Sequence, residues 1–122
     1  MLTGVYDREL RPAGVQATQF ALLSALDTCP GAGQDQLAAW LAMEQSTLSR
    51  NLQGLARKRW ISSRTAAGAR AARYDATAAG RQALARARPA WQRAQARVKR
   101  ALGADWAALA PLLHKLATLA AA

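Results

Sequence analysis

The sequence has few acidic residues, one cysteine and one histidine, and each scarcity excludes a class of protein. Only 7 of the 122 residues are Asp or Glu, against 17 Lys or Arg, so the formal net charge is +10. The scattered acids provide no carboxylate pair for general acid–base catalysis. Cys29 cannot form an internal disulfide, and His114 has no second ligand for a metal site. We therefore expect no enzyme, no metal and no cofactor, and we interpret His114 as a packed or interface residue.

Long apolar runs are also missing. No stretch reaches the run of about 18 apolar residues that a membrane span needs, and we expect no secretory leader. With 52% hydrophobic residues, the chain is too apolar for a disordered basic tail. We expect one domain over residues 1–122, in the cytoplasm and away from membranes. A domain of this size buries only about two thirds of its unfolded surface, so a partner subunit would add stability.

The positive charge is concentrated in the second half of the chain. Between residues 46 and 100, Asp75 is the only acid among fourteen basic residues: Arg50, Arg57, Lys58, Arg59, Arg64, Arg70, Arg73, Arg81, Arg86, Arg88, Arg93, Arg97, Lys99 and Arg100. The planar guanidinium of arginine suits bidentate contact with phosphate or guanine. This imbalance favours a polyanionic partner, and the alternative is a solvated surface rich in Arg and Ala because of a GC-rich genome.

Apolar spacing predicts four helices in the first half, over residues 2–10, 18–27, 34–42 and 46–58. Proline and glycine end the first helix at 11–14, and the segment 29–33 is interpreted as a turn. The third and fourth helices are separated by about three residues, with Ser46 as the expected N-cap. They form a helix-turn-helix.

Two short runs, 60–64 and 70–76, predict a β-hairpin. Thr77 is the expected N-cap of a helix over 78–102, which Pro89 should kink because it lacks an N–H group. In that helix Leu84, Trp91 and Val98 recur every seven residues, as in a coiled-coil seam. A last helix is expected from Asp105 to about residue 121.

The helix over 46–58 has the pattern of a recognition helix. Leu48, Leu52 and Leu55 recur at i, i+4 and i+7 and predict a buried stripe. Because a helix turns by about 100° per residue, polar side chains occupy the opposite side. Short polar groups and free N–H groups at a helix start suit phosphate, while Arg and Gln suit guanine and adenine. We predict DNA contacts by Ser46, Thr47, Ser49, Arg50, Gln53 and Arg57, and the alternative is an ordinary exposed helix face.

The hairpin carries Arg64, Arg70 and Arg73 around a tip of small residues, 66–69. A small tip can lie against a duplex, so we predict that these arginines also contact DNA, one of them in the minor groove. The alternative is that Arg64 and Arg73 are solvated strand residues.

From about Tyr6 to Leu119 the chain resembles the MarR family of winged-helix transcriptional regulators. The most specific match is the helix-turn-helix, with Leu37-Ala38, Met43, Ser46-Thr47-Leu48-Ser49-Arg50 and Leu55. Leu10-Arg11-Pro12-Ala13-Gly14-Val15 and Gln19-Phe20-Ala21-Leu22-Leu23 resemble the linker into the second helix of the family. Thr77-Ala78-Ala79-Gly80 resembles its Leu-Thr-x-x-Gly motif, with Ala76 in place of leucine.

The sequence departs from the family pattern at two places. Gly68 stands where the wing of the family has an aspartate that pairs with an arginine, matched here by Arg70. The first helix, 2–10, is also shorter than is usual in the family.

The resemblance implies a mainly α fold with a small β-hairpin wing. The helix-turn-helix would span about 34–58, the wing about 60–76, and dimerisation helices about 2–10 and 78–121. It implies a homodimer with these contact residues: Tyr6, Leu10, Leu84, Trp91, Val98, Trp106, Leu109, Leu112, Leu113 and Leu116. A two-fold dimer presents recognition helices about 34 Å apart to a pseudo-palindromic duplex. Most members are repressors, and many release DNA when a small aromatic or phenolic acid binds between the dimer base and the DNA-binding lobe.

Two other functions remain open from the sequence. The helix over 78–102 could bind nucleic acid or an anionic surface without specificity, because Arg86, Arg93, Arg97 and Arg100 share one side with no acid opposite. The short first helix would also suit a chain that heterodimerises with a longer relative. Some MarR relatives sense peroxide through a cysteine in the first helix, which Cys29 does not occupy, so we expect no redox role for it.

Overall fold

The computed structural model describes residues 2–65, 67–68, 71–105 and 108. Most of the expected C-terminal helix lies outside the described residues. So do several residues with predicted roles, namely Arg70, Trp106, Leu109, Leu112, Leu113, His114 and Leu116.

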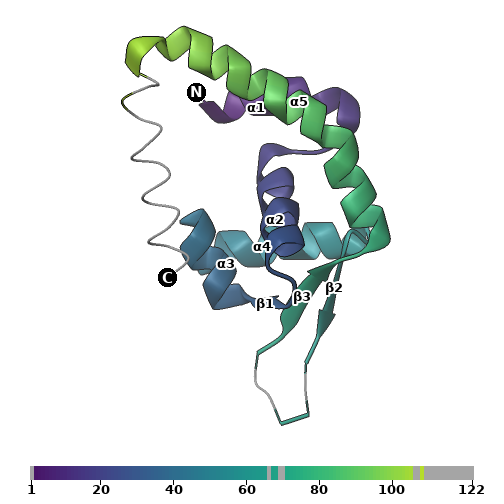
Figure 1. The fold of residues 1–122 in the computed structure, drawn as a ribbon. Coiled ribbons are helices and arrows are strands. Elements are labelled where there is room, and N and C mark those ends of the chain that lie inside the picture. Colours follow the sequence, from purple (N-terminus) through teal and green to yellow (C-terminus); the bar gives the residue numbers. More distant parts are fainter. Residues whose placement is uncertain (1, 66, 69–70, 106–107, 109–122) are drawn as a thin grey trace.

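The chain is mainly helical with a small antiparallel sheet, as expected (Figure 1). Its elements in order are α1 (Leu2–Leu10), the 3-10 turn η1 (Arg11–Ala13), α2 (Ala17–Thr28), β1 (Ala32–Gly33), α3 (Gln34–Leu41), α4 (Gln45–Arg57), β2 (Ile61–Arg64), β3 (Arg73–Ala76) and α5 (Ala78–Leu102). In Figure 1, α1 and the later part of α5 lie at one end, and the hairpin of β2 and β3 projects from the other. The helices α2, α3 and α4 lie between these two ends.

Two helices begin earlier than the sequence predicts. The N-cap of α4 is Glu44, whose extended backbone (φ −64°, ψ 148°) precedes the first turn, so Ser46 lies inside the helix. The helix α2 begins at Ala17, whose N–H donates to Asp7 Oδ1 over 2.7 Å. The N–H of Gln16 donates to Gln19 Oε1 over 2.9 Å. The contact from Asp7 comes from another helix, α1, which local propensity does not reveal, whereas Gln19 caps α2 from within its own first turn.

The sheet has three strands in the order β1-β3-β2. The hairpin strands were expected, although they are shorter than predicted, at 61–64 and 73–76. The expectation of a plain turn at 29–33 was wrong at its end, because Ala32 pairs with Tyr74 and Gly33 with Arg73. A two-residue strand is too short to leave a pattern in the sequence. Its backbone pairing nevertheless joins the start of α3 to the wing.

The core is built from leucines on several helices. The stripe of Leu48, Leu52 and Leu55 on α4 is buried, as predicted. Leu10 and Leu84 are 0% and 2% exposed within the core of a single chain. Both side chains therefore pack inside a single chain, and their contact with a second subunit stays a prediction.

The helix α5 starts against the base of the wing. Thr77 caps it as predicted, accepting from the Gly80 N–H over 3.0 Å, and the Thr77 hydroxyl donates to the Arg59 carbonyl over 2.7 Å. The helix continues through Pro89 to Leu102. It bends along its length in Figure 1, as expected for a proline inside a helix.

Aromatic stacking and ion pairs hold α1 against α5. The ring of Trp91 lies between Tyr6 and Phe20, with centroid distances of 4.3 Å and 4.4 Å. Burial raises the pKa of Tyr6. Val98, another residue of the predicted seam, is also buried within the chain, at 5% exposed. The seam of α5 therefore packs largely against its own chain.

Glu9 corrects the expectation that no acid opposes the arginines of α5. Its carboxylate lies 2.8 Å from Arg97 Nη1 and 3.5 Å from Arg93 Nε. The hydrogen bond from Arg97 is the main cause that lowers the pKa of Glu9. Arg86, on the same helix, donates from Nε to the Ala13 carbonyl over 3.1 Å. Three of the four arginines therefore have partners inside the chain.

Candidate nucleic-acid interface

The helix α4 presents a polar face opposite its buried leucines. Ser46, Arg50, Gln53 and Arg57 are exposed on it, and Thr47 and Ser49 are half-buried at its edges. The structure therefore brings together all six residues predicted on this helix. Arg50 Nη2 lies 3.5 Å from Thr47 Oγ1, a long contact that leaves its other guanidinium donors available.

Side chains from α2 and α3 fix the orientation of α4. Asn51, which the sequence did not single out, donates from Nδ2 to the Thr47 carbonyl over 2.9 Å and accepts from the Thr18 hydroxyl over 3.3 Å. Gln34 at the start of α3 donates from Nε2 to Ser49 Oγ over 2.7 Å. Both amide side chains are partly buried. The sequence showed only that Gln34 and Asn51 lie within the helix-turn-helix, and it did not reveal their partners.

The two predicted wing arginines within the described residues both have partners in the chain. Arg64 Nε lies 3.1 Å from Asp75 Oδ2 across the hairpin, with the arginine side chain 67% exposed. Arg73 Nη1 donates to the Gly31 carbonyl over 3.1 Å. They are therefore more constrained than solvated strand residues, and each keeps guanidinium donors free.

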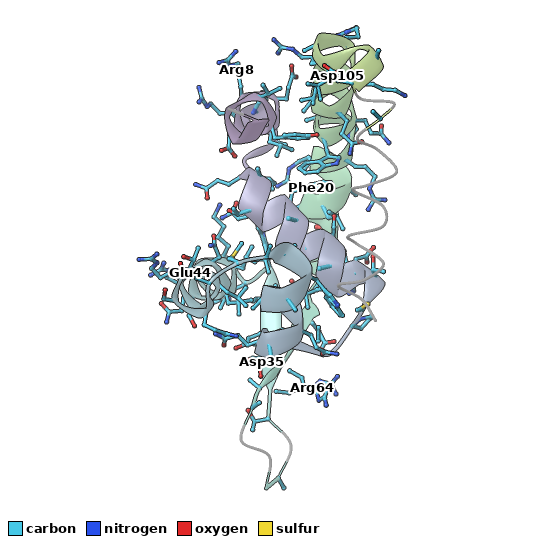
Figure 2. All side chains as sticks on the ribbon, turned by 90° about the vertical axis from the view of Figure 1, so that its left-hand side faces the viewer. Arg8, Phe20, Asp35, Glu44, Arg64 and Asp105 are labelled. Atoms are coloured by element: carbon cyan, nitrogen blue, oxygen red, sulfur yellow. The ribbon has the colours of Figure 1, made fainter. Side chains whose placement is uncertain are left out.

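Residues at the two ends of the molecule are well separated in Figure 2. Arg8 and Asp105 lie at the end formed by α1 and α5, Asp35 and Arg64 lie toward the wing, and Phe20 lies between. The helix-turn-helix and the wing thus occupy the part of the molecule away from α1.

Two adjoining hollows lie between α4 and the segment that connects α1 to α2. The first, about 520 Å³, is lined by Asp7, Arg11, Gly14, Val15, Gln16, Thr18 and Lys58. The second, about 380 Å³, is lined by Gln16, Gln19, Arg50, Asn51, Gly54, Arg57 and Lys58. The single acid in their linings, Asp7, accepts from the Ala17 N–H, so cations dominate both hollows.

The described part of the chain lacks two other features. None of its helices is long and apolar enough to cross a membrane. Among the same residues, no group of three or more His, Cys, Asp or Glu side chains is placed to hold a metal ion.

Comparisons with known proteins agree with this geometry. Residues 17–80 match a family model described as a winged helix DNA-binding domain. A crystal structure of the M. tuberculosis transcriptional regulator MosR in complex with DNA is 36% identical, covers 98% of this chain and 86% of that chain, and has a TM-score of 0.81. A crystal structure of a MarR family transcription regulator is 31% identical, covers 97% and 82% of the two chains, and has a TM-score of 0.75. The chain belongs to the MarR family.

One further MarR-like structure shares the fold at lower identity. CouR from Rhodococcus jostii RHA1, solved bound to p-coumaroyl-CoA, is 18% identical, covers 98% of this chain and 83% of that chain, and has a TM-score of 0.78. No curated protein sequence matches the chain.

An ion pair joins the two strands of the wing. Gly68 removes the aspartate that the family pattern places near the tip. The pair Arg64–Asp75 instead joins β2 to β3 nearer the base of the hairpin, where Ser62 pairs with Asp75 and Ser63 with Tyr74. The described part of this wing is thus joined by an ion pair away from its tip.

Proposed function

We propose that this MarR-family protein is a homodimeric, sequence-specific DNA-binding regulator, without enzymatic activity, that acts as a repressor in the cytoplasm. The observation that carries the proposal is the division of α4 into a buried leucine stripe and an exposed face with Arg50, Gln53 and Arg57. This arrangement suits the major groove, where arginine can bind guanine and glutamine can bind adenine.

The remaining predicted DNA contacts have distinct proposed roles. Ser46, Thr47 and Ser49 lie in the first turns of α4, where hydroxyl groups suit phosphates or base edges. Arg64 and Arg73 keep the wing in place and use their free donors on phosphates. Arg70, which follows the predicted tip 66–69 in the sequence, is proposed for the minor groove.

The proposed homodimer would place two copies of α4 about one helical turn apart on a pseudo-palindromic operator. Support comes from the MarR-family fold and from α1 and α5, which pack together at the end away from the wing (Figure 1). Tyr6 and Trp91 are half-buried there and retain surface for a partner. Trp106 and the leucines after it are proposed to complete the interface. Sedimentation should show a dimer at micromolar concentration, and a monomer would support a heterodimer with a longer relative.

A small aromatic or phenolic acid is the proposed effector that releases DNA. The two hollows beside α4 support this proposal, because Arg11, Arg57 and Lys58 surround them with positive charge. Ligand binding there would act on the segment between α1 and α4. CouR, which shares the fold, was solved bound to p-coumaroyl-CoA, so a protein of this fold can hold a ligand with an aromatic acyl group.

Non-specific binding through α5 is less well supported than it was from the sequence. Arg86, Arg93 and Arg97 have partners on η1 and α1, so their charges are partly neutralised or held. Among the described arginines of that side, Arg100 is the one for which no such contact is observed.

The test is competition between duplexes at about 150 mM salt. The purified full chain should bind one duplex, found by footprinting the DNA that flanks its own gene, far more tightly than random competitor. Non-specific binding alone has a dissociation constant of about 10⁻⁴–10⁻⁶ M at such salt. Equal affinity for every duplex would overturn the proposal.

A further inference from the structure

The Gln34 side chain joins the first residue of α3 to the polar face of α4. Its Nε2 lies 2.7 Å from Ser49 Oγ and 3.5 Å from the Gln45 carbonyl oxygen. A carbonyl oxygen only accepts hydrogen bonds, so this pair of neighbours favours the amide nitrogen as the atom that faces both groups. The backbone of α4 therefore fixes which way the amide points. Gln34 is the donor in its bond to Ser49.

This bond decides what the Ser49 hydroxyl can offer to a ligand. A hydroxyl has one hydrogen and two lone pairs, and Gln34 occupies one of the lone pairs. The hydrogen is left for a partner outside the chain. Ser46 and Gln53 lie three residues before and four residues after Ser49, on the same side of the helix and exposed. The Ser49 hydroxyl thus borders the face proposed to enter the groove.

Gln34 is itself held in place from the wing. It follows Gly33, which pairs with Arg73 of β3 and whose N–H donates to Gln36 Oε1 over 2.9 Å. The backbone before Gln34 is therefore fixed by the sheet and by a helix cap. Such support makes the donor geometry available before any ligand binds.

We propose that Gln34 is a positioning residue that makes Ser49 a fixed hydrogen-bond donor toward DNA. Ser49 then favours an acceptor at one base pair of each half-site, such as guanine O6 or N7 or thymine O4, over the amino group of cytosine, because its hydrogen is free and only one of its two lone pairs remains. This inference rests on the proposed function, because it presumes that α4 reads a duplex.

The experiment uses the full chain and a pool of random duplexes, sequenced before and after selection by binding. Gln34→Glu is the main variant, because a carboxylate only accepts and would take the Ser49 hydrogen. Gln34→Met removes the donor without adding charge. The matched control is Gln36→Glu, which adds the same charge on the same helix and keeps the oxygen that caps Gly33. Circular dichroism checks the fold of each variant.

The wild type should enrich an acceptor base at one position per half-site. Gln34→Met should weaken that preference about two- to ten-fold, the range expected for one neutral hydrogen bond. Gln34→Glu should shift the same position toward cytosine or adenine, which carry amino groups. Gln36→Glu should weaken overall binding and leave the preference unchanged. Ser49→Ala should abolish the preference at that position alone.

The inference is overturned if the wild type enriches a motif and both Gln34 variants enrich the same one. An equal loss at every position would also overturn it, because it would indicate a general structural role or a Ser49 contact to phosphate. If the wild type enriches no motif, the proposed function fails and the inference fails with it. Should Gln34→Glu not fold, the result for Gln34→Met decides.

Discussion

Residue 80 has no room for a side chain. A Cβ there would lie 2.0 Å from the Trp60 carbonyl oxygen and 3.2 Å from Leu23 Cδ2. The same carbonyl accepts from the Thr77 N–H over 2.9 Å, so the start of α5 is fixed against the backbone that leads into β2. The glycine of the Thr-x-x-Gly motif thus has a steric explanation in this chain.

Gly80→Ala should therefore lower the free energy of unfolding by about 1–3 kcal/mol, the usual range for overpacking. The matched control is Gly54→Ala in α4, where a Cβ would have nothing within 4 Å. That substitution should raise the free energy of unfolding by about 0.5–1 kcal/mol, because alanine favours a helix. Urea denaturation measures both, and equal effects of the two variants would refute the steric account.

Glu9 makes the attachment of α1 sensitive to pH. The hydrogen bond from Arg97 lowers the pKa of Glu9 in the folded state relative to the unfolded state. The ion pair therefore stabilises the fold above the ordinary carboxylate pKa, and this contribution is lost as the pH falls through the lowered value. Glu9→Gln should reduce Tm at pH 7, and its difference from the wild type should disappear in acid. A difference that stays constant down to pH 3 would contradict the role of this carboxylate, and Arg97→Gln should behave in the same way.

At the scale of elements, the leucine patterns predicted most of the helices because they repeat locally every three or four residues. The stripe of Leu48, Leu52 and Leu55 is an example. The cap by Thr77 could also be predicted, because a threonine directly before a helix is a local signal. By contrast, β1 has two small residues and depends on β3 some forty positions away, so no local pattern reveals it. Long-range pairing also explains why Glu9 and Arg97, 88 positions apart, went unnoticed.

In the candidate site too, local patterns could be predicted and long-range contacts could not. The exposed face of α4 could be predicted from 3.6-residue periodicity alone. The partners of Ser49 and Arg73 could not, because both lie on other elements: Gln34 on α3 and Gly31 in the turn before β1. The sequence therefore indicates which residues face outward, and the tertiary contacts determine which donors remain free.

Removing the acid of the wing, Asp75, distinguishes the effect of its charge on DNA affinity from the effect of its ion pair on stability. Asp75 pairs with Arg64, but that arginine is 67% exposed, so the pair should contribute less than about 1 kcal/mol to stability. Asp75→Asn also removes a negative charge from the surface proposed to face DNA, an effect of up to about 1 kcal/mol per close charge in water. We expect affinity for random duplex to rise about two- to five-fold at low salt, with little change in Tm.

Asp105→Asn is the matched control for that measurement, because Asp105 is exposed at the opposite end of the molecule (Figure 2). It removes the same charge and should leave DNA affinity nearly unchanged. A fall in affinity for Asp75→Asn would show that the brace matters more than the charge.

At the scale of the whole molecule, the positive charge favours binding to DNA but does not identify the element that binds. The net charge of +10 attracts any polyanion, so affinity for DNA alone would not show that α4 reads it. The residues of α5 matter here, because its exposed arginines would contribute to any non-specific attraction. Selectivity between duplexes is the property that the proposed role of the helix-turn-helix predicts.

The most direct test compares two double variants that each remove one arginine and one glutamine from an exposed helix face. Arg50→Ala with Gln53→Ala alters α4, and Arg88→Ala with Gln92→Ala alters α5. The ratio of affinities for the operator and for random duplex is measured at about 150 mM salt, where non-specific binding is weak. The account predicts that the α4 variant loses this ratio and that the α5 variant keeps it. An α4 variant that still discriminates, or an α5 variant that does not, would contradict it.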